Sequence, residues 1–86
     1  MFKAKYTKQA KDFLRKSDAA LARRINKRIR QLCVNPFPGK VKRFAGSNGK
    51  VFRIRIGDYR ILYEIYYEDK ILLIHKIEKR SKAYQF

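Results

Sequence analysis

The feature that most constrains the fold is a pair of strand-like runs joined by only two residues. Residues 50–56 and 59–66 are rich in Ile, Val, Tyr and Phe, which favour strands, and Gly57 and Asp58 lie between them. A two-residue connection with Gly at its first position is typical of a type II′ β-hairpin turn. The sequence therefore predicts an antiparallel hairpin in which Ile56 faces Tyr59, and every further pair follows from that one.

This register separates the side chains of the hairpin onto two faces, because successive residues of a strand point to opposite sides. The apolar set is expected to pack on the helices: Phe52, Ile54, Ile56, Tyr59, Ile61 and Tyr63. Arg53, Arg55 and Arg60 share the other face, with Arg55 directly opposite Arg60. Like charges so placed cost roughly 0.2–1 kcal/mol, which favours an anion between them, and the guanidinium fork matches phosphate. The alternative is a set of outward side chains that cover apolar neighbours.

The first half of the chain predicts a strand and two helices. Residues 2–6 alternate apolar and charged side chains, which indicates a strand with one buried face. Thr7 is placed to cap a helix over residues 8–16, and Ser17 or Asp18 to cap a second one. The apolar residues of that second helix fall on one stripe, and they are Leu21, Ile25, Ile29 and Leu32. Two prolines within residues 35–39 end it.

The second half predicts the rest of a sheet. Residues 41–44 are expected to form a short edge strand, and residues 70–77 a third strand of the meander after a turn at Glu68 and Asp69. Without Gly, that turn is free to be longer and its register to slip. The first strand is expected to join beside the meander. The order predicts one α+β domain over residues 1–86, with an N-terminal strand, a two-helix hairpin and an antiparallel meander packed on the helices.

Charge points to the kind of partner. The chain has 23 Lys and Arg against 7 Asp and Glu, a formal net charge of +16. Self-repulsion at this density opposes compaction, and a polyanion such as RNA relieves it. Heat adaptation alone would add Glu along with Lys. The acids are scattered and His75 is the only histidine, so neither a metal nor another cofactor is expected.

The cellular location follows from three absences in the sequence. Cys33 is the only cysteine, so no intramolecular disulfide is possible, and the residue itself is expected in the core. The first five residues are followed by charged ones, unlike a signal peptide. No apolar run approaches the roughly 20 residues that span a bilayer. We therefore expect a cytoplasmic protein without membrane association.

The hairpin and its flanks resemble the RelE/ParE toxin superfamily. The similar segments are residues 51–65, with Gly-Asp-Tyr-Arg at 57–60, and residues 35–37, 42–46 and 79–84. The resemblance implies a RelE-like microbial RNase fold and the toxin of a type II toxin–antitoxin system. In the RelE branch it implies ribosome-dependent cleavage of mRNA in the A site, in which the 2′-hydroxyl attacks the adjacent phosphate without a metal.

The resemblance also implies site residues. The catalytic positions would be Arg53, Arg55, Arg60, Arg80 and Tyr84. Further RNA contacts would come from Lys42, Arg43, Lys50, Lys79 and Lys82. The RelE branch often has Lys where this chain has Arg53 and Arg55, and arginine does not readily lose its proton. The general base is therefore left open among Tyr84, Lys50 and the ribosome.

Two other functions stay open at this point. One is a ParE-type inhibitor of DNA gyrase, although such a protein does not need a basic trio facing solvent. The other is an RNA- or ribosome-binding module that does not cleave. For the toxin, a cognate RelB-like antitoxin with an acidic or amphipathic segment is the expected partner, besides mRNA and the ribosome. We expect the toxin alone to be a monomer, and a heteromer with its antitoxin.

Overall fold

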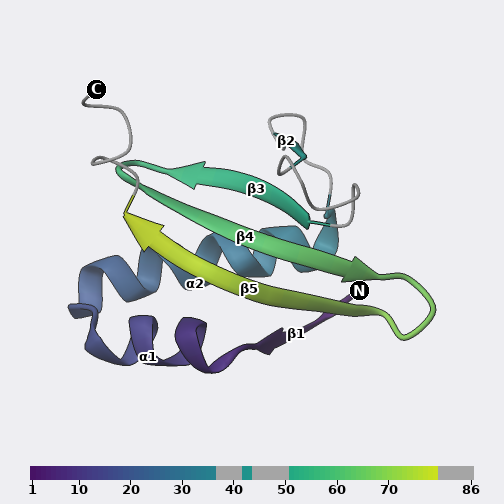
Figure 1. Ribbon diagram of the computed structural model, residues 1–86, viewed down its shortest axis with the longest axis horizontal. Helices are drawn as coiled ribbons and strands as arrows, with labels where there is room; N and C mark the ends of the chain where they lie inside the picture. Colours follow the sequence, from purple (N-terminus) through teal and green to yellow (C-terminus); the bar gives the residue numbers. More distant parts are fainter. Residues whose placement is uncertain (37–41, 44–50, 80–86) are drawn as a thin grey trace.

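The computed structural model describes residues 1–36, the backbone of 42–43, and residues 51–79. The elements in chain order are β1 (Lys3–Tyr6), α1 (Lys8–Lys16), α2 (Ala19–Val34), β2 (Lys42–Arg43), β3 (Val51–Ile56), β4 (Tyr59–Tyr66) and β5 (Ile71–Lys79). They form a sheet in the order β1-β5-β4-β3-β2, with β1 parallel to β5 and the other pairs antiparallel. Both helices lie on one side of this sheet (Figure 1). The predicted α+β class and the place of the first strand are confirmed.

Side-chain caps set the start of each helix. The Thr7 hydroxyl accepts a hydrogen bond from the Ala10 amide of α1 and donates one to the His75 carbonyl of β5, at 2.7 Å. Asp18 caps α2 by accepting from the Leu21 amide at 2.8 Å. Ser17, the other predicted candidate, ends α1 instead. These caps satisfy helix amides that have no partner within the helix.

The core lies between α2 and the helix-facing side of the sheet. Its buried members are Ala10, Ile25, Ile29, Leu32, Cys33, Ile54, Ile61, Tyr63, Leu72, Ile74 and Ile77. The predicted apolar stripe of α2 and the predicted apolar face of the hairpin therefore meet, with Leu21, Phe52 and Ile56 packed at the margin. The buried Tyr63 hydroxyl donates to the Pro36 carbonyl at 2.7 Å, which ties the end of α2 to the sheet.

The hairpin register is the predicted one at every pair from Phe52 with Tyr63 to Ile56 with Tyr59. Gly57 has a φ of +56°. Lys70 is the one non-glycine residue of the described ranges with positive φ, so Asp58 keeps a negative value, as a type II′ turn requires. The turn therefore fixes which residues of β3 and β4 share a face.

The predicted bounds of the last strand were wrong. The strand runs from Ile71 to Lys79 rather than over 70–77, and the preceding turn includes Lys70 with a φ of 56°. The register shifts at Leu62/Tyr63, where β5 carries one extra residue, and His75 and Lys76 are both exposed in succession. This β-bulge interrupts the alternation of side chains by which a strand is predicted from sequence. After the bulge the strand continues beyond Ile77, its last predicted residue, to Lys79.

Gly57 gives the first testable prediction. A residue with a side chain at this position would have to adopt the left-handed φ of +56°. Its Cβ would lie 2.7 Å from Arg24 Nη2. The arginine end is flexible and can move, but the backbone strain stays. We expect Gly57→Ala to lower the free energy of unfolding by about 1–2 kcal/mol in urea denaturation. Asp58→Ala, in the same turn at negative φ, is the matched control, and an equal loss in both variants would contradict this explanation.

Candidate functional site

The face of the sheet that the helices leave uncovered (Figure 1) carries three of the predicted catalytic residues, Arg53, Arg55 and Arg60. We call it the outer face, and register and alternation place there Arg53, Arg55, Arg60, Leu62, Glu64, Lys76 and Glu78. Cations outnumber carboxylates on this face. It is therefore the part of the sheet on which an anion is expected to bind.

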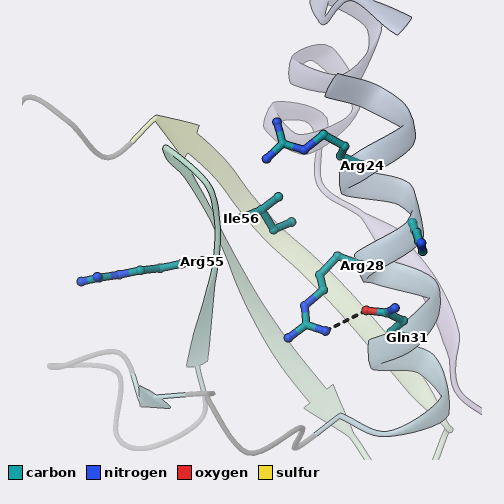
Figure 2. Close-up of a pocket in the computed structure, with 6 residues that line it drawn as sticks. Arg24, Arg28, Gln31, Arg55 and Ile56 are labelled. Atoms are coloured by element: carbon teal, nitrogen blue, oxygen red, sulfur yellow. Dashed lines mark hydrogen bonds between the residues drawn. The ribbon is translucent and has the colours of Figure 1, made fainter. Parts of the chain in front are cut away.

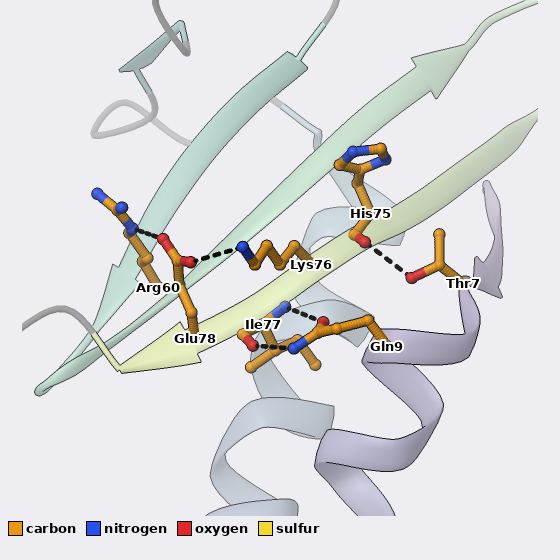
Figure 3. Close-up of polar contacts among 7 residues, drawn as sticks. All are labelled: Thr7, Gln9, Arg60, His75, Lys76, Ile77 and Glu78. Atoms are coloured by element: carbon orange, nitrogen blue, oxygen red, sulfur yellow. Dashed lines mark hydrogen bonds and ion pairs between the residues drawn. The ribbon is translucent and has the colours of Figure 1, made fainter.

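One row across the outer face joins three charged residues. Arg55 of β3 stands opposite Arg60 of β4, and Arg60 stands opposite Glu78 of β5. The Nε of Arg60 donates to Glu78 Oε2, and Lys76 Nζ lies 3.3 Å from Glu78 Oε1 (Figure 3). The side chains of Arg60 and Glu78 are only 17% and 23% exposed. The carboxylate therefore holds the Arg60 guanidinium in a fixed direction.

Glu78 was not among the residues predicted for the site. The sequence placed an external anion beside the paired arginines, whereas Arg60 already contacts a carboxylate of the chain itself. The last strand was predicted to end at Ile77, one residue before Glu78. The place of Glu78 beside Arg60 depends on the register of β4 with β5, which a bulge shifts, and no motif in the sequence indicates that bulge.

Two opposing effects act on the Glu78 carboxyl. Partial burial alone would raise its pKa, but hydrogen bonds and charges from Arg60 and Lys76 outweigh burial and lower the pKa below its ordinary value. The carboxyl is therefore charged at neutral pH. Its neighbours on the outer face hold it in the ionised form.

This pKa gives a prediction for the pH dependence of stability. A carboxyl with a lowered folded-state pKa stabilises the fold above its unfolded value of about 4.3, and the contribution is lost as pH falls through the folded value. We expect the difference in Tm between the wild type and Glu78→Gln to be largest near pH 6–7 and to shrink below about pH 4. A difference that stays constant from pH 7 to pH 3 in calorimetry would contradict the assignment.

Arg55 and Arg53 differ in exposure. Arg55 is exposed, and its side chain projects away from α2 (Figure 2). Arg53 is half-buried, and it flanks Leu62 together with Lys76 in the register. Leu62 is only 4% exposed although it lies on the face without helices. Its register partners on the neighbouring strands are Arg53 and Lys76, and the aliphatic stems of such long side chains cover apolar neighbours.

A second basic region lies between β3 and α2. A groove of about 300 Å³ runs there, and its lining residues are Arg24, Lys27, Arg28, Gln31, Arg55 and Ile56, so that it shares Arg55 with the outer face (Figure 2). Arg28 Nη1 donates to Gln31 Oε1 at 2.7 Å. No carboxylate is among the lining residues. Apart from Arg55, none of these residues was predicted for the site.

The remaining predicted contacts are placed only in part. The backbone of β2 puts Lys42 opposite Arg53 and Arg43 opposite Phe52. Lys79 is exposed and stands opposite Tyr59, which is on the helix-facing side, so alternation separates it from the outer face. The predicted residues that lie outside the described ranges are Lys50, Arg80, Lys82 and Tyr84.

Residues 1–36 and 51–79 contain no group of three His, Cys, Asp or Glu side chains arranged to hold a metal ion. His75 Nδ1 lies 3.4 Å from Glu64 Oε1, away from the arginine row. Burial raises the pKa of the Cys33 thiol. Neither helix of the described ranges is long and apolar enough to cross a membrane.

Comparison with known proteins identifies the family. The family model described as "ParE toxin of type II toxin-antitoxin system, parDE" matches residues 4–84. A protein of Methanocaldococcus jannaschii named "Putative toxin RelE1" is 40% identical over 60 residues, which cover 66% of each chain, just under two thirds of that relative.

Solved structures agree with this. The RelE chain of the archaeal RelE–RelB complex from Pyrococcus horikoshii is 29% identical with a TM-score of 0.79, over 94% of this chain and 97% of that one. The isolated E. coli RelE toxin has a TM-score of 0.80 at 17% identity, over 98% and 92% of the two chains. The chain belongs to the RelE/ParE family, which the matched model describes as toxins of type II toxin–antitoxin systems.

Proposed function

We propose that this toxin is a ribosome-dependent endoribonuclease that cleaves mRNA by directing the RNA's own 2′-hydroxyl onto the adjacent phosphate, without a metal. One observation carries the proposal. Arg55, exposed, and Arg60, held by Glu78, stand side by side in a row on the outer face. A gyrase inhibitor has no need of such a row, whereas a phosphate undergoing attack does.

The two arginines have complementary parts in this chemistry. Arg55 presents an exposed guanidinium that binds a phosphate from solvent, in the bidentate geometry that arginine favours. Arg60 is already fixed, so it stabilises the charge that develops on the phosphate oxygens without first having to reorganise. Arg53 adds positive charge along the same strand. By their place in the family motif, Arg80 and Tyr84 complete the site in this proposal.

The ribosome supplies what an open sheet face lacks. Attack by the 2′-hydroxyl requires the nucleophile, phosphorus and leaving oxygen in line, and a single strand on an open surface takes many conformations. A ribosome holds the codon of its A site in one conformation. The toxin then adds charge to an RNA that is already oriented, in the cytoplasm where translation occurs.

The partner of this toxin is an antitoxin, and we propose one of the RelB type. The solved relatives include RelE toxins in complex with RelB antitoxins, among them the Pyrococcus horikoshii pair. A chain with a net charge of +16 favours an acidic or amphipathic partner segment. We propose a monomeric toxin when alone and a heteromer with its antitoxin.

Induction of the toxin in a bacterial host tests the function. The wild type is expected to arrest growth and to leave transcripts cut inside translated frames. The double variant Arg60→Ala/Arg80→Ala should neither arrest growth nor cut. Full toxicity in the double variant would contradict the site. Since the matched family model carries the ParE name, DNA supercoiling is measured in parallel, and gyrase inhibition with intact transcripts would contradict the endoribonuclease.

A further inference from the structure

The arginine row leaves the proton of the attacking 2′-hydroxyl without an acceptor. Guanidinium stays protonated in proteins, so Arg53, Arg55 and Arg60 bind charge but cannot serve as a base. We propose that Glu78 is the general base of the cleavage reaction and accepts this proton. The inference rests on the endoribonuclease function proposed above, and it assigns a catalytic part to a residue outside the basic motif.

Position distinguishes Glu78 from the other carboxylate of the outer face. Glu78 is in the same row as Arg55 and Arg60, and it contacts the Arg60 guanidinium. Glu64 lies four residues further along β4, about 13 Å away at the usual rise of a strand. Its oxygens contact the Tyr66 hydroxyl and the His75 ring instead. A phosphate that binds Arg55 and Arg60 is therefore beside Glu78 and remote from Glu64.

The charges around Glu78 suit a base that is ionised before the substrate arrives. Arg60 of β4 and Lys76 of β5 contact the Glu78 carboxylate. Arg55 lies one strand further, on β3, and Asp58 lies in the turn at this end of the sheet. On the opposite face of the sheet, α1 packs through uncharged Gln9, which hydrogen-bonds the Ile77 backbone (Figure 3). The two cations keep Glu78 deprotonated in the free toxin.

Binding of the RNA phosphate is expected to make the Glu78 carboxylate a stronger base. A phosphate that binds Arg60 takes up part of the positive charge that was directed at Glu78. The carboxylate then becomes more basic when the RNA is in place. A general base need only reach within hydrogen-bond distance of the proton it removes. General-base catalysis by Glu78 therefore requires that a 2′-hydroxyl next to a phosphate on Arg60 comes within this distance of Glu78, which contacts the same guanidinium.

The step balances without any further reactant. The O2′–H bond breaks as O2′ bonds to phosphorus, and the proton passes to a carboxylate oxygen of Glu78. The P–O5′ bond breaks, and O5′ takes a proton from water. The products are a 2′,3′-cyclic phosphate and a 5′-hydroxyl, after which Glu78 returns its proton to solvent. No electron is transferred and no metal is required.

Glu78→Gln is the first test, with Glu64→Gln as its matched control on the same face. Both variants keep the size of the side chain and remove one negative charge. With purified toxin and ribosomes programmed with a defined mRNA, Glu78→Gln should cleave about 10²–10⁴-fold more slowly in a single turnover. The toxin concentration for half-maximal rate should stay within about threefold, and Glu64→Gln should match the wild type.

A role in holding Arg60 would also slow Glu78→Gln, so the carboxylate itself is tested next. Glu78→Asp keeps a carboxylate and should recover at least about tenfold of the lost rate. Formate and acetate should accelerate Glu78→Ala, with acetate more effective because it is the stronger base. Absence of both effects would reduce Glu78 to a positioning residue and overturn the proposal.

These experiments distinguish failure of the general-base assignment from failure of the endoribonuclease function. If the wild type cleaves and Glu78→Gln cleaves within about threefold of it, the general base is another group and the endoribonuclease assignment stands. If the wild type leaves mRNA intact on the ribosome, the proposed function is wrong and the base assignment is wrong with it. Thermal melts of each variant verify that the differences arise in the folded protein.

Discussion

Arg55→Ala is expected to lower the single-turnover rate of mRNA cleavage on the ribosome by about 10²–10³-fold. The free energy of unfolding should change by no more than about 0.5 kcal/mol. The two expectations separate because Arg55 is exposed and points away from α2, so that its loss removes a phosphate contact and little packing. Urea denaturation and cleavage assays on the same preparation measure both.

The matched control for Arg55→Ala is Arg23→Ala. Arg23 is an exposed arginine of α2, and its replacement makes the same change in net charge. If bulk charge alone brings the toxin to RNA, both variants should lose activity equally. We expect Arg23→Ala to stay within about threefold of the wild type, since it is outside the arginine row. An equal loss in the two variants would contradict a site localised to the outer face.

The largest effect on stability is expected from Ile61→Ala. Ile61 is fully buried in the central strand β4, in contact with the cluster between sheet and helices. Removing these methyl groups from a core usually costs about 2–5 kcal/mol, through lost burial and the cavity that remains. The total stability of a domain is only about 5–15 kcal/mol, so the variant should lose a large share of it in urea denaturation.

Val34→Ala is the control for Ile61→Ala. Val34 is also a β-branched aliphatic residue, but it is 68% exposed at the end of α2. We expect its replacement to change the free energy of unfolding by less than about 0.5 kcal/mol. A comparable loss in both variants would mean that the core described here does not supply the stability. A loss confined to Ile61→Ala would show that the core between the helices and the sheet supplies the stability.

The hairpin could be predicted fully because its determinant is local. Two turn residues, Gly57 and Asp58, fix one pair, and the period of two then fixes all others. The third strand followed no such rule. Its turn is longer and includes Lys70 at positive φ, and a bulge near Leu62 shifts the register, so neither end was predicted correctly.

The contrast between a register fixed by a local turn and one shifted by a bulge also decided how much of the site could be predicted. The row of Arg55 and Arg60 followed from the hairpin alone. Glu78 belongs to that row only through the pairing of β4 with β5, which runs over the bulge and is set by packing rather than by a turn motif. Nothing in the local sequence indicated that this carboxylate contacts Arg60. The position of the proton acceptor proposed here therefore became visible only in three dimensions.

Two basic surfaces border β3 and share Arg55, and they differ in how far carboxylates neutralise their charge. Glu78 contacts two cations of the outer face, whereas no carboxylate lines the groove beside Arg24 and Arg28. Net charge alone would make both equal candidates for RNA. The outer face is favoured because an exposed arginine, a fixed arginine and a carboxylate stand in one row there, so groups that bind a phosphate lie beside a group that can accept a proton.

The proposed endoribonuclease function is tested most directly by analysing the ends of the RNA after a reaction with purified components. Purified toxin is added to ribosomes carrying a defined mRNA with a known codon in the A site. We expect a cut within that codon that leaves a 2′,3′-cyclic phosphate, and no cut when the attacking 2′-hydroxyl is replaced by hydrogen. Cleavage of the 2′-deoxy substrate, or intact mRNA together with inhibition of DNA gyrase, would contradict it.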